Sequence, residues 1–547
     1  MPKYYRFRAF GCQVPASVDK SPGMMYNSYI QCKGCEVMPA PIAWNRSPLP
    51  ENRFAPLPLG AIRLEGTLHE ALKAERGGDE EERLCRAFLL GNEGEQHEAI
   101  ARLKKKLGDD GAALENARAL MRVYGALNDV SVAQSLLETL KRLYDGLEES
   151  PALGAEKTAL AADIAQTAVW LYNLTGNKAL LTLCQKLRAQ GPDWTSLLHT
   201  FPQTRPVKEF LTQENPAYWR VDGQTIAAAL RACGLRALYE GGLKNETAFQ
   251  TAWKKLMRYH GAAHGLYNAS PLLAGTSPAG GVQRETVEEL IRSLETLQWA
   301  LGAPECGDVM ERVCQNALRA PGRMQRANQS EPCEGAAPAA LAVASSAMWM
   351  AARDGLAAFG YGPCSVKWVA GGAPVRVDVL SDGTCGEKIT LRVRVKSPAS
   401  FRLYLRIPAW AENALCAVNS KASQANAGGF HVVERLWRDG DTVELTFPAN
   451  VRVQKGYHQS AAIVRGARTY ALPVEAGARW NMALLPERGF ETDGEAVWAY
   501  ACPTAEWMEF DAMPVLPHVM ADHVEKIKLI PYGETRARVA QFPVGCI

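Results

Sequence analysis

Glu285 and Glu289 have the residue type and spacing that could support chemistry. They lie four residues apart in a helix-forming stretch, which places both carboxylates on one helix face. Paired carboxylates can serve glycoside hydrolysis, in which one acid protonates the leaving oxygen and a second group stabilises or attacks the sugar. A solvated helix face with one inward-pointing acid is the alternative interpretation of the same spacing.

Two histidines and several tryptophans are candidates for binding a substrate. His260 and His264 are four residues apart and could share a helix face toward a metal or a sugar hydroxyl. A glycine follows each histidine, which equally favours a turn with a structural role. Trp194, Trp219 and Trp299 could stack on a sugar, although aromatic residues in helical repeats more often belong to the core.

The fourteen cysteines are scattered and mostly lie in apolar segments, which indicates reduced core thiols rather than a disulfide framework. Cys32 and Cys35 form the closest pair, but no second pair completes a zinc ribbon. Cys333 lies between Glu331 and Glu334, in polar surroundings where it could be a nucleophile or a metal ligand. Neighbouring carboxylates raise the pKa of a thiol, so a leftover, unreactive thiol is the alternative.

Composition excludes several classes of protein. The 547 residues carry 61 basic and 58 acidic side chains, and this balance indicates no binding to nucleic acid. No run of eighteen apolar residues occurs and the first residues lack the apolar core of a signal peptide, so we expect a cytoplasmic protein without membrane contact. We find no phosphate-cradling loop and no Ser-His-Asp spacing.

The chain divides into three parts that differ in composition and in the spacing of their apolar residues. Residues 1–65 are rich in Pro, Gly and Asn and predict an irregular arm. Residues 66–360 have helical periodicity, with breaks after aromatic residues that predict helical hairpins arranged as a closed toroid or an open solenoid. Residues 361–547 alternate at period two between turns, which predicts one or two antiparallel β-sandwiches.

Motifs in this order resemble glycoside hydrolase family 127, the β-L-arabinofuranosidase group. The helical part carries Trp170-Leu-Tyr-Asn-Leu-Thr-Gly-Asn177 and Gly307-Asp-Val-Met-Glu-Arg312, and the β part carries Leu405-Arg-Ile-Pro-Ala-Trp410 followed by Arg435-Leu-Trp437. The resemblance runs nearly end to end. It implies an α+β multidomain protein in which an (α/α)6 helical toroid precedes C-terminal antiparallel β-sandwich domains.

The same resemblance implies a site that this chain does not reproduce. Members of the family use a zinc ion held by a Glu-x-Cys pair and a later Cys-Cys pair, with a cysteine nucleophile and a glutamate as acid/base. Here the first pair aligns with Gln283-Arg284-Glu285, the second with Pro332-Cys333, and the acid/base position with Ser270-Pro271. We therefore expect no resident cofactor, and zinc only where Cys333 and Glu285 form a residual site.

Two functions follow from this pattern. The first is a glycoside hydrolase-like protein that acts on or binds a small oligosaccharide or glycoside, with the zinc-thiolate nucleophile lost. Its catalytic candidates are Glu285, Glu289 and Cys333; its substrate-binding candidates are His260, His264, Trp194 and Gln283. The second is an inactive carbohydrate-binding or scaffold subunit. Homodimers, or hetero-oligomers with an active paralogue, are the expected assemblies.

Overall fold

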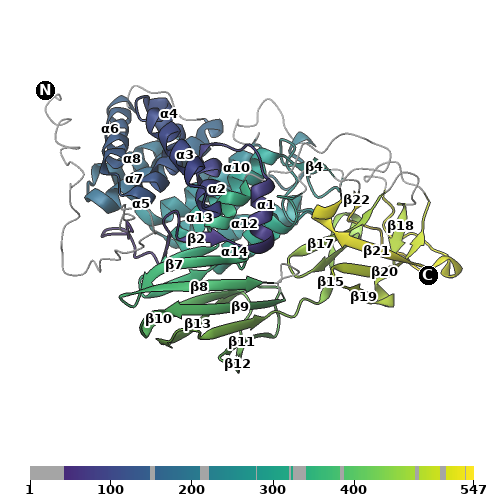
Figure 1. Ribbon diagram of the computed structural model, residues 1–547. Coiled ribbons are helices and arrows are strands. Elements are labelled where there is room, and N and C mark those ends of the chain that lie inside the picture. The colour runs from purple at the N-terminus through teal and green to yellow at the C-terminus, as the bar shows by residue number, and fades with distance from the viewer. Residues whose placement is uncertain are drawn as a thin grey trace.

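The computed structural model describes most of the chain from Ile42 onward as helices, strands and their connections (Figure 1). The described residues are 42–147, 154–209, 221–278, 280–319, 322–323, 340–381, 387–474, 480–505, 513–535 and 538–547. Cys32, Cys35, Trp219 and Cys333 lie outside them. None of the described helices is long and apolar enough to cross a membrane.

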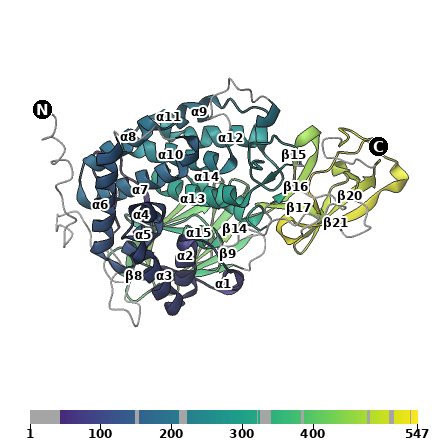
Figure 2. The ribbon, with the colours of Figure 1, turned by 90° about the horizontal axis from the view of Figure 1, so that it is seen from above.

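Six inner helices form a closed ring, in which each helix contacts the next and the last contacts the first. These helices are α2 (Glu80–Leu90), α5 (Ala117–Leu127), α7 (Thr158–Thr175), α10 (Gly223–Tyr239), α13 (Arg284–Leu301) and α15 (Ala340–Ser346). Closure of the ring decides between the two helical architectures, because an open solenoid would leave its first and last helices apart. The helical part is a toroid (Figure 2).

Outer helices pack against the inner ring and alternate with it along the chain. They are α3 (Glu93–Lys106), α6 (Val130–Gly146), α8 (Ala179–Gln190), α12 (Ala248–His260) and α14 (Pro304–Gln315), with shorter helices α1 (Gly66–Ala74), α4 (Asp110–Glu115), α9 (Trp194–Thr200) and α11 (Leu243–Glu246). Inner helices end where the sequence predicts turns: Asn128, Gly176 and Gly302 take left-handed backbone conformations after α5, α7 and α13.

The inner helices approach one another closely. A Cβ atom at Gly234 of α10 would lie 2.4 Å from Cδ2 of Leu297 on α13, so any larger residue there would force the Leu297 side chain to move. The apolar residues of both helices are almost completely buried. The backbones of α10 and α13 are therefore held in fixed register, which fixes where the polar side chains of α13 point.

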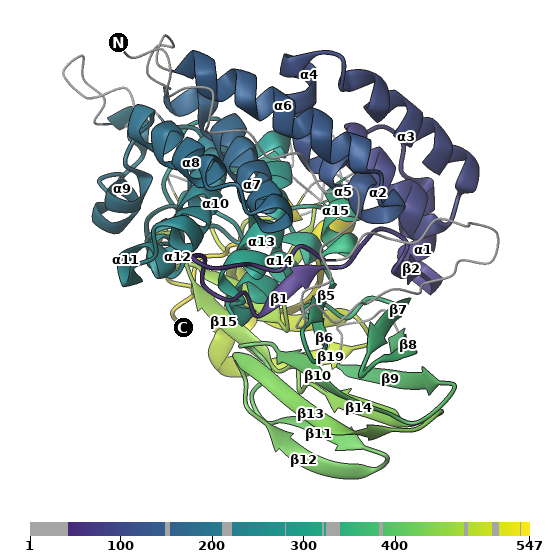
Figure 3. The same ribbon diagram turned by 90° about the vertical axis from the view of Figure 1, so that its left-hand side faces the viewer.

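Two antiparallel sheets pack beneath the toroid as a sandwich and share one core with it (Figures 1 and 3). One sheet has the order β1 (Phe54–Pro56), β5 (Trp349–Ala352), β6 (Gly355–Ala358), β10 (Ala399–Ile407), β13 (Gly429–Trp437). The other has the order β12 (Lys421–Ala425), β11 (Ala414–Val418), β14 (Thr442–Thr446), β9 (Lys388–Val395), β8 (Ala373–Ser381), β7 (Cys364–Ala370), β2 (Ile62–Leu64). Only β6 and β10 pair in parallel among these described strands.

A third sheet lies beside the sandwich at the C-terminal end (Figure 1). It contains β15 (Val451–Lys455), β16 (Ala461–Arg465), β17 (Arg468–Pro473), β18 (Met482–Leu484), β19 (Phe490–Asp493), β20 (Ala496–Pro503), β21 (Glu525–Pro531) and β22 (Arg538–Val539). A separate pair, β3 (Gly281–Val282) and β4 (Gly322–Arg323), flanks the toroid. Asn316, after α14, bonds to the backbone of Ala467 and Thr469 and so anchors the third sheet to the toroid.

One predicted boundary and the predicted character of the arm need correction. The change from helix to strand falls at Trp349, before the predicted residue 361, because Trp349–Ala352 and Gly355–Ala358 form a buried hairpin of the first sheet. The short length and uniformly apolar character of these strands conceal period-two alternation. The described part of the arm is also not wholly irregular, since β1 and β2 each add an edge strand to a sandwich sheet.

The Phe54 side chain packs the arm against the sandwich, so replacing it with a smaller residue should destabilise the protein. Its fully buried ring makes edge contacts with Phe359 and Tyr404 at centroid distances of 5.5 and 5.4 Å. We expect Phe54→Ala to cost about 3–5 kcal/mol and to lower the thermal unfolding midpoint measured by circular dichroism. Leu436→Ala, at a residue 51% exposed on β13, is the control that should change the midpoint little.

Candidate functional site

The toroid axis is filled by ion pairs between inner helices. Arg118 and Arg122 lie one turn apart on α5, and both bridge Glu81 of α2 and Glu295 of α13. The nitrogen–oxygen distances are 3.1 and 2.8 Å for Arg118 and 2.8 and 2.6 Å for Arg122. Arg118 also donates to Gln166 of α7, at 2.9 Å. Ion pairs in which carboxylates and guanidinium groups alternate therefore connect α2, α5 and α13.

Arg231 of α10 extends this network on the axis. Its guanidinium is fully buried and pairs with Asp163 of α7 at 2.5 Å and with Glu289 of α13 at 2.7 Å. Burial raises the pKa of Glu289, and the Arg231 charge opposes that rise. For Glu81, burial acts to raise the pKa, but Arg118 and Arg122 together hold it well below the usual range. Glu81 is a fixed anion.

A third cluster lies at the N-terminal end of the inner helices. Arg292 of α13 pairs with Asp79 at 2.5 Å and with Glu82 at 3.3 Å. Asp79 and Glu82 form a capping box that begins α2, because each side chain accepts a hydrogen bond from the backbone of the other. Burial first and Asp79 second raise the pKa of Glu82 to about 7, against the opposing effect of Arg292.

At the opposite end of the ring, the network forms the floor of a cavity of about 140 Å³, which we call the axial cavity. Its charged lining residues are Glu81, Arg118, Arg122 and Glu295. Trp170 of α7, Trp299 of α13 and Tyr124 of α5 supply aromatic walls, and arm residues including Leu57 and Leu59 also contribute lining. A cavity with these walls could hold a small ring-shaped polar molecule.

The structure separates the residues predicted for catalysis. Glu289 is 3% exposed and points into the network, whereas Glu285, one turn earlier, is exposed to solvent. Gln283 is the exposed N-cap residue of α13, and its side chain makes no capping bond. The hypothesis of one inward acid on this helix therefore holds for Glu289, and the two glutamates do not share a site. Their catalytic roles stay predictions.

The two histidines occupy structural positions. His260 is the last residue of α12; its Nε2 lies 2.6 Å from the carbonyl oxygen of Gln203, and its Nδ1 accepts from the backbone of Gly275 at 2.9 Å. His264 lies in the following turn rather than on the helix, with Nε2 3.2 Å from Oδ1 of Asn268. Burial lowers the pKa of both to about 4. The helix ends at His260, so the turn is the alternative that the structure has, and a role of the two histidines in substrate binding stays a prediction.

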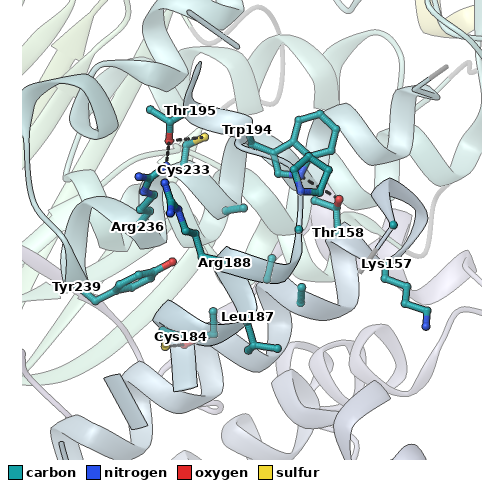
Figure 4. A pocket seen from close by; sticks show the side chains of 17 residues that line it. Lys157, Thr158, Cys184, Leu187, Arg188, Trp194, Thr195, Cys233, Arg236 and Tyr239 are labelled. Carbon is teal, nitrogen blue, oxygen red and sulfur yellow. Dashed lines mark hydrogen bonds between the residues drawn. The ribbon is translucent and has the colours of Figure 1, made fainter. Parts of the chain in front are cut away.

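Trp194 lines a different pocket from the axial cavity, one of about 70 Å³ between α7, α8, α9 and α10 (Figure 4). Its indole donates to the hydroxyl of Thr158 at 3.1 Å. Arg188, Arg236 and Tyr239 also contribute to this pocket, and two alanine-rich helix faces form much of its lining. Trp194 is absent from the lining of the axial cavity, and its predicted role in substrate binding stays a prediction.

The residues aligned with the family's zinc ligands do not form a zinc-binding set in the described part of the chain. Gln283 and Glu285 face solvent, and Arg284 pairs with Glu288 at 2.5 Å. Among the described residues, no group of three or more His, Cys, Asp or Glu side chains is placed to hold a metal ion. Cys333 lies outside the described residues, so its part in a residual site stays a prediction.

The chain thus combines an (α/α)6 toroid, a following β-sandwich and a cavity with charged and aromatic walls. Residues 355–449 match the model of the GH127 middle domain of β-L-arabinofuranosidases. Among solved structures, the chain is similar to a GH127 β-L-arabinofuranosidase from Geobacillus stearothermophilus T6, with 16% identity, a TM-score of 0.60, and 87% of this chain and 92% of that chain covered.

Two further structures share the fold. One is described as a glycoside hydrolase, with 12% identity, a TM-score of 0.58, and 92% and 100% of the two chains covered. The other is a GH127 β-arabinofuranosidase, with 12% identity, a TM-score of 0.55, and 90% and 98% covered. Among curated proteins, nothing matches the sequence. The chain is a GH127-like protein, as the motifs predicted: residues 355–449 match the model of the family's middle domain, and the fold is shared with solved GH127 structures.

Sequence reasoning missed most of the axial network. Charged residues recur in phase with the apolar face of three helices: Glu81 beside Leu84 and Cys85, Arg118 four residues before Arg122, and Glu295 beside Leu294. Such charges on a buried face are the signal that could have revealed the network, because an inward charge requires a partner. Trp299 was recognised as a candidate, and it does line the axial cavity.

Removing one carboxylate should show how far the network holds the toroid together. Glu295→Gln leaves Arg118 and Arg122 without one of their two shared anions, and a broken buried pair costs about 3–5 kcal/mol. We expect a lower midpoint in thermal unfolding followed by circular dichroism. Glu98→Gln, at an exposed carboxylate that pairs with Arg102, is the control. Equal midpoints for the two variants would contradict a stabilising role for the network.

The raised pKa of Glu82 predicts a pH-dependent stability. A glutamate of the unfolded chain has a pKa near 4.5, and folded Glu82 has a pKa of about 7. Because the folded protein binds this proton more tightly than the unfolded chain does, its free energy of unfolding falls as pH rises between these values. At one pKa unit per 1.36 kcal/mol, the full loss is about 3 kcal/mol. We expect Glu82→Gln to raise the calorimetric unfolding temperature at pH 8 relative to the native chain.

The same comparison at pH 4 provides the internal control. Glu82 is protonated there in the folded chain and mostly protonated in the unfolded chain, and glutamine is uncharged in both, so the difference between the proteins should largely vanish. A difference that stays constant from pH 4 to pH 8 would show that the substitution acts through packing or through the capping box.

Proposed function

We propose that the protein binds one sugar unit of a small neutral glycoside or oligosaccharide in the axial cavity of its toroid. The observation that carries the proposal is the construction of this cavity, in which Trp170 and Trp299 stand beside the paired ions of Glu295, Arg118 and Arg122. The GH127 middle domain and the shared fold support a carbohydrate as the ligand class.

Size and charge define the ligand more closely. An apolar cavity of about 150 Å³ binds benzene, so a cavity of about 140 Å³ accommodates a single ring. Its two arginines are balanced by Glu81 and Glu295, which favours a neutral ligand over a sugar acid or an amino sugar. Carboxylates accept and guanidinium groups donate hydrogen bonds, so together they serve both roles of sugar hydroxyls, while an indole covers an apolar ring face.

The chemistry of these carboxylates favours binding over hydrolysis. A general acid must carry a proton near neutral pH, and Glu81 is held ionised by Arg118 and Arg122. We propose that the zinc-thiolate mechanism of the family is also lost, because the aligned residues Gln283 and Glu285 face solvent. A carbohydrate-binding role, alone or in an assembly with an active paralogue or a second copy, is the function that these side chains support best.

Hydrolysis is the second candidate, and the acids with raised pKa values favour it. Glu82 titrates near 7 and could donate a proton, and the buried Glu289 also has a raised pKa. Both carboxylates lie within the electrostatic influence of Arg292. In this mechanism Glu82 protonates the leaving oxygen, and Glu289, in the ionised form that its ion pair with Arg231 favours, stabilises the positive charge that develops on the sugar.

Isothermal titration calorimetry with neutral monosaccharides and their 4-nitrophenyl glycosides tests the proposal on the full chain. We expect Trp299→Ala to weaken binding at least tenfold, or about 1.4 kcal/mol, because stacking on the indole is lost. Trp498→Ala, in β20 of the third sheet, is the matched control and should leave affinity unchanged. Binding that Trp299→Ala does not alter would place the sugar elsewhere and contradict the proposal.

Release of 4-nitrophenol in the same samples separates the two candidates. Turnover that is abolished by Glu82→Gln and by Glu289→Gln, with binding retained, would establish hydrolysis and contradict a purely binding role. Binding without turnover in the native chain would establish the binding role. Stoichiometric zinc that is lost on Cys333→Ser would overturn the proposed loss of the zinc-thiolate mechanism.

A further inference from the structure

A cleft between the toroid, the sandwich and the third sheet is larger than both the axial cavity and the pocket beside Trp194. Its volume is about 570 Å³, within the range of small-molecule sites and roughly four times that of the axial cavity. Helices α1, α13, α14 and α15 form its helical wall, and residues of the sandwich and of the third sheet close the other sides. We call it the interdomain cleft.

On the toroid side of the cleft, Glu311 of α14 has one carboxylate oxygen available as a hydrogen-bond acceptor. Its Oε2 accepts from Arg406 at 3.0 Å and from the indole of Trp410 at 3.3 Å. Its Oε1 makes no hydrogen bond with another described residue. Arg406 is 1% exposed, and its other nitrogens bond to Asp308 and to the backbone of Phe359. Buried partners thus hold the Glu311 carboxylate in a fixed orientation.

The third sheet provides polar groups on the far side of the cleft. Arg468 of β17 pairs with Glu495 at 3.0 Å and donates to Gln315 of α14 at 3.2 Å, so it spans the cleft between domains. Glu534 makes no hydrogen bond or ion pair with another described residue. Burial, followed by the charge of Glu495, raises its pKa. Arg319, which follows α14 in the chain, packs the stem of its side chain on Gly533.

Apolar and aromatic surfaces lie between these polar groups. Tyr361 and Phe447 contact each other with ring centroids 5.9 Å apart, and Met348 and Phe359 add to the same lining. The hydroxyl of Tyr361 bonds to the backbone oxygen of Arg406, which fixes the ring. A ligand here meets rigid apolar faces and oriented acceptors together, the combination that sugars require.

We propose that the interdomain cleft is a second carbohydrate site, which binds a neutral chain of several sugar units. Its volume exceeds one sugar ring severalfold. Its charged lining residues are Glu75, Glu311, Glu495 and Glu534 against Arg319, Arg406 and Arg468. Acids outnumber bases in this set, so an acidic oligosaccharide is repelled, while hydroxyl groups find both donors and acceptors. The site is independent of the axial cavity.

Calorimetric titration of the full chain with neutral disaccharides to tetrasaccharides, and with oligogalacturonates of the same lengths, tests the proposal. We expect the neutral chains to bind more tightly than the monosaccharides, and the oligogalacturonates to bind at least tenfold more weakly. Glu534→Ala removes an exposed acceptor, and Glu311→Gln replaces a half-buried carboxylate. Each should weaken neutral-chain binding severalfold, and the two together at least tenfold.

Trp299→Ala is the control that separates the two sites, because it alters the axial cavity and leaves the interdomain cleft intact. Hydrogen–deuterium exchange supplies a second readout: a bound chain should protect α14 around Glu311 and the segment around Glu534. Neutral-chain affinity that falls with Trp299→Ala but not with Glu534→Ala would overturn the proposal. So would equal binding of neutral and acidic chains, or the absence of binding by any neutral chain.

Discussion

The buried charge network on the toroid axis is the constraint on which the rest of the helical domain depends. Inward-facing charges are costly to bury, and they are tolerated here because each arginine meets two or more carboxylates from neighbouring helices. Glu81 and Glu295 can face each other across α5 only while Arg118 and Arg122 lie between them. The network therefore specifies which helices are neighbours, a selectivity that apolar packing alone does not provide.

The arm connects this helical domain to the sandwich. Residues 54–64 supply β1 to one sandwich sheet and β2 to the other, and residues between them line the axial cavity. Phe54 is enclosed by sandwich aromatic rings, while Leu57 and Leu59 reach the toroid. One short segment thus joins the β-sandwich to the wall of the candidate sugar site. Because β1 and β2 are paired at both ends of this stretch, the wall is a rigid part of the fold.

The sequence predicted the architecture because local signals sufficed for it. Left-handed residues such as Asn128 and Gly302 end helices through local backbone preferences, and alternation in β9 and β10 reports one buried face. The order of helices and strands, together with the family motifs, then gave the toroid and the sandwich. The boundary at Trp349 was missed because a fully buried hairpin has no alternation to detect.

The candidate site was harder to predict, because its residues come from distant positions and their roles depend on their partners. Glu285 and Glu289 differ by one helical turn, yet one faces solvent and the other meets Arg231. The interval of four residues places both side chains on one side of the helix. The packing of α10 against α13 determines how much of that side is buried. The spacing identifies both glutamates as candidates, but only the packing of the helices shows that one is buried and the other exposed.

The same ring explains why this fold favours binding over proton transfer at the axial cavity. Arg118 and Arg122 stabilise the ionised state of Glu81, and an acid stabilised in this way has little tendency to take up a proton. Its oxygens can still accept hydrogen bonds from hydroxyl groups, as the proposed sugar binding requires. Glu82 differs because its single arginine is shared with Asp79 and Glu81, and burial then outweighs the attraction. Within one network, the ratio of arginines to carboxylates decides which acids serve only as acceptors and which retain a proton at neutral pH.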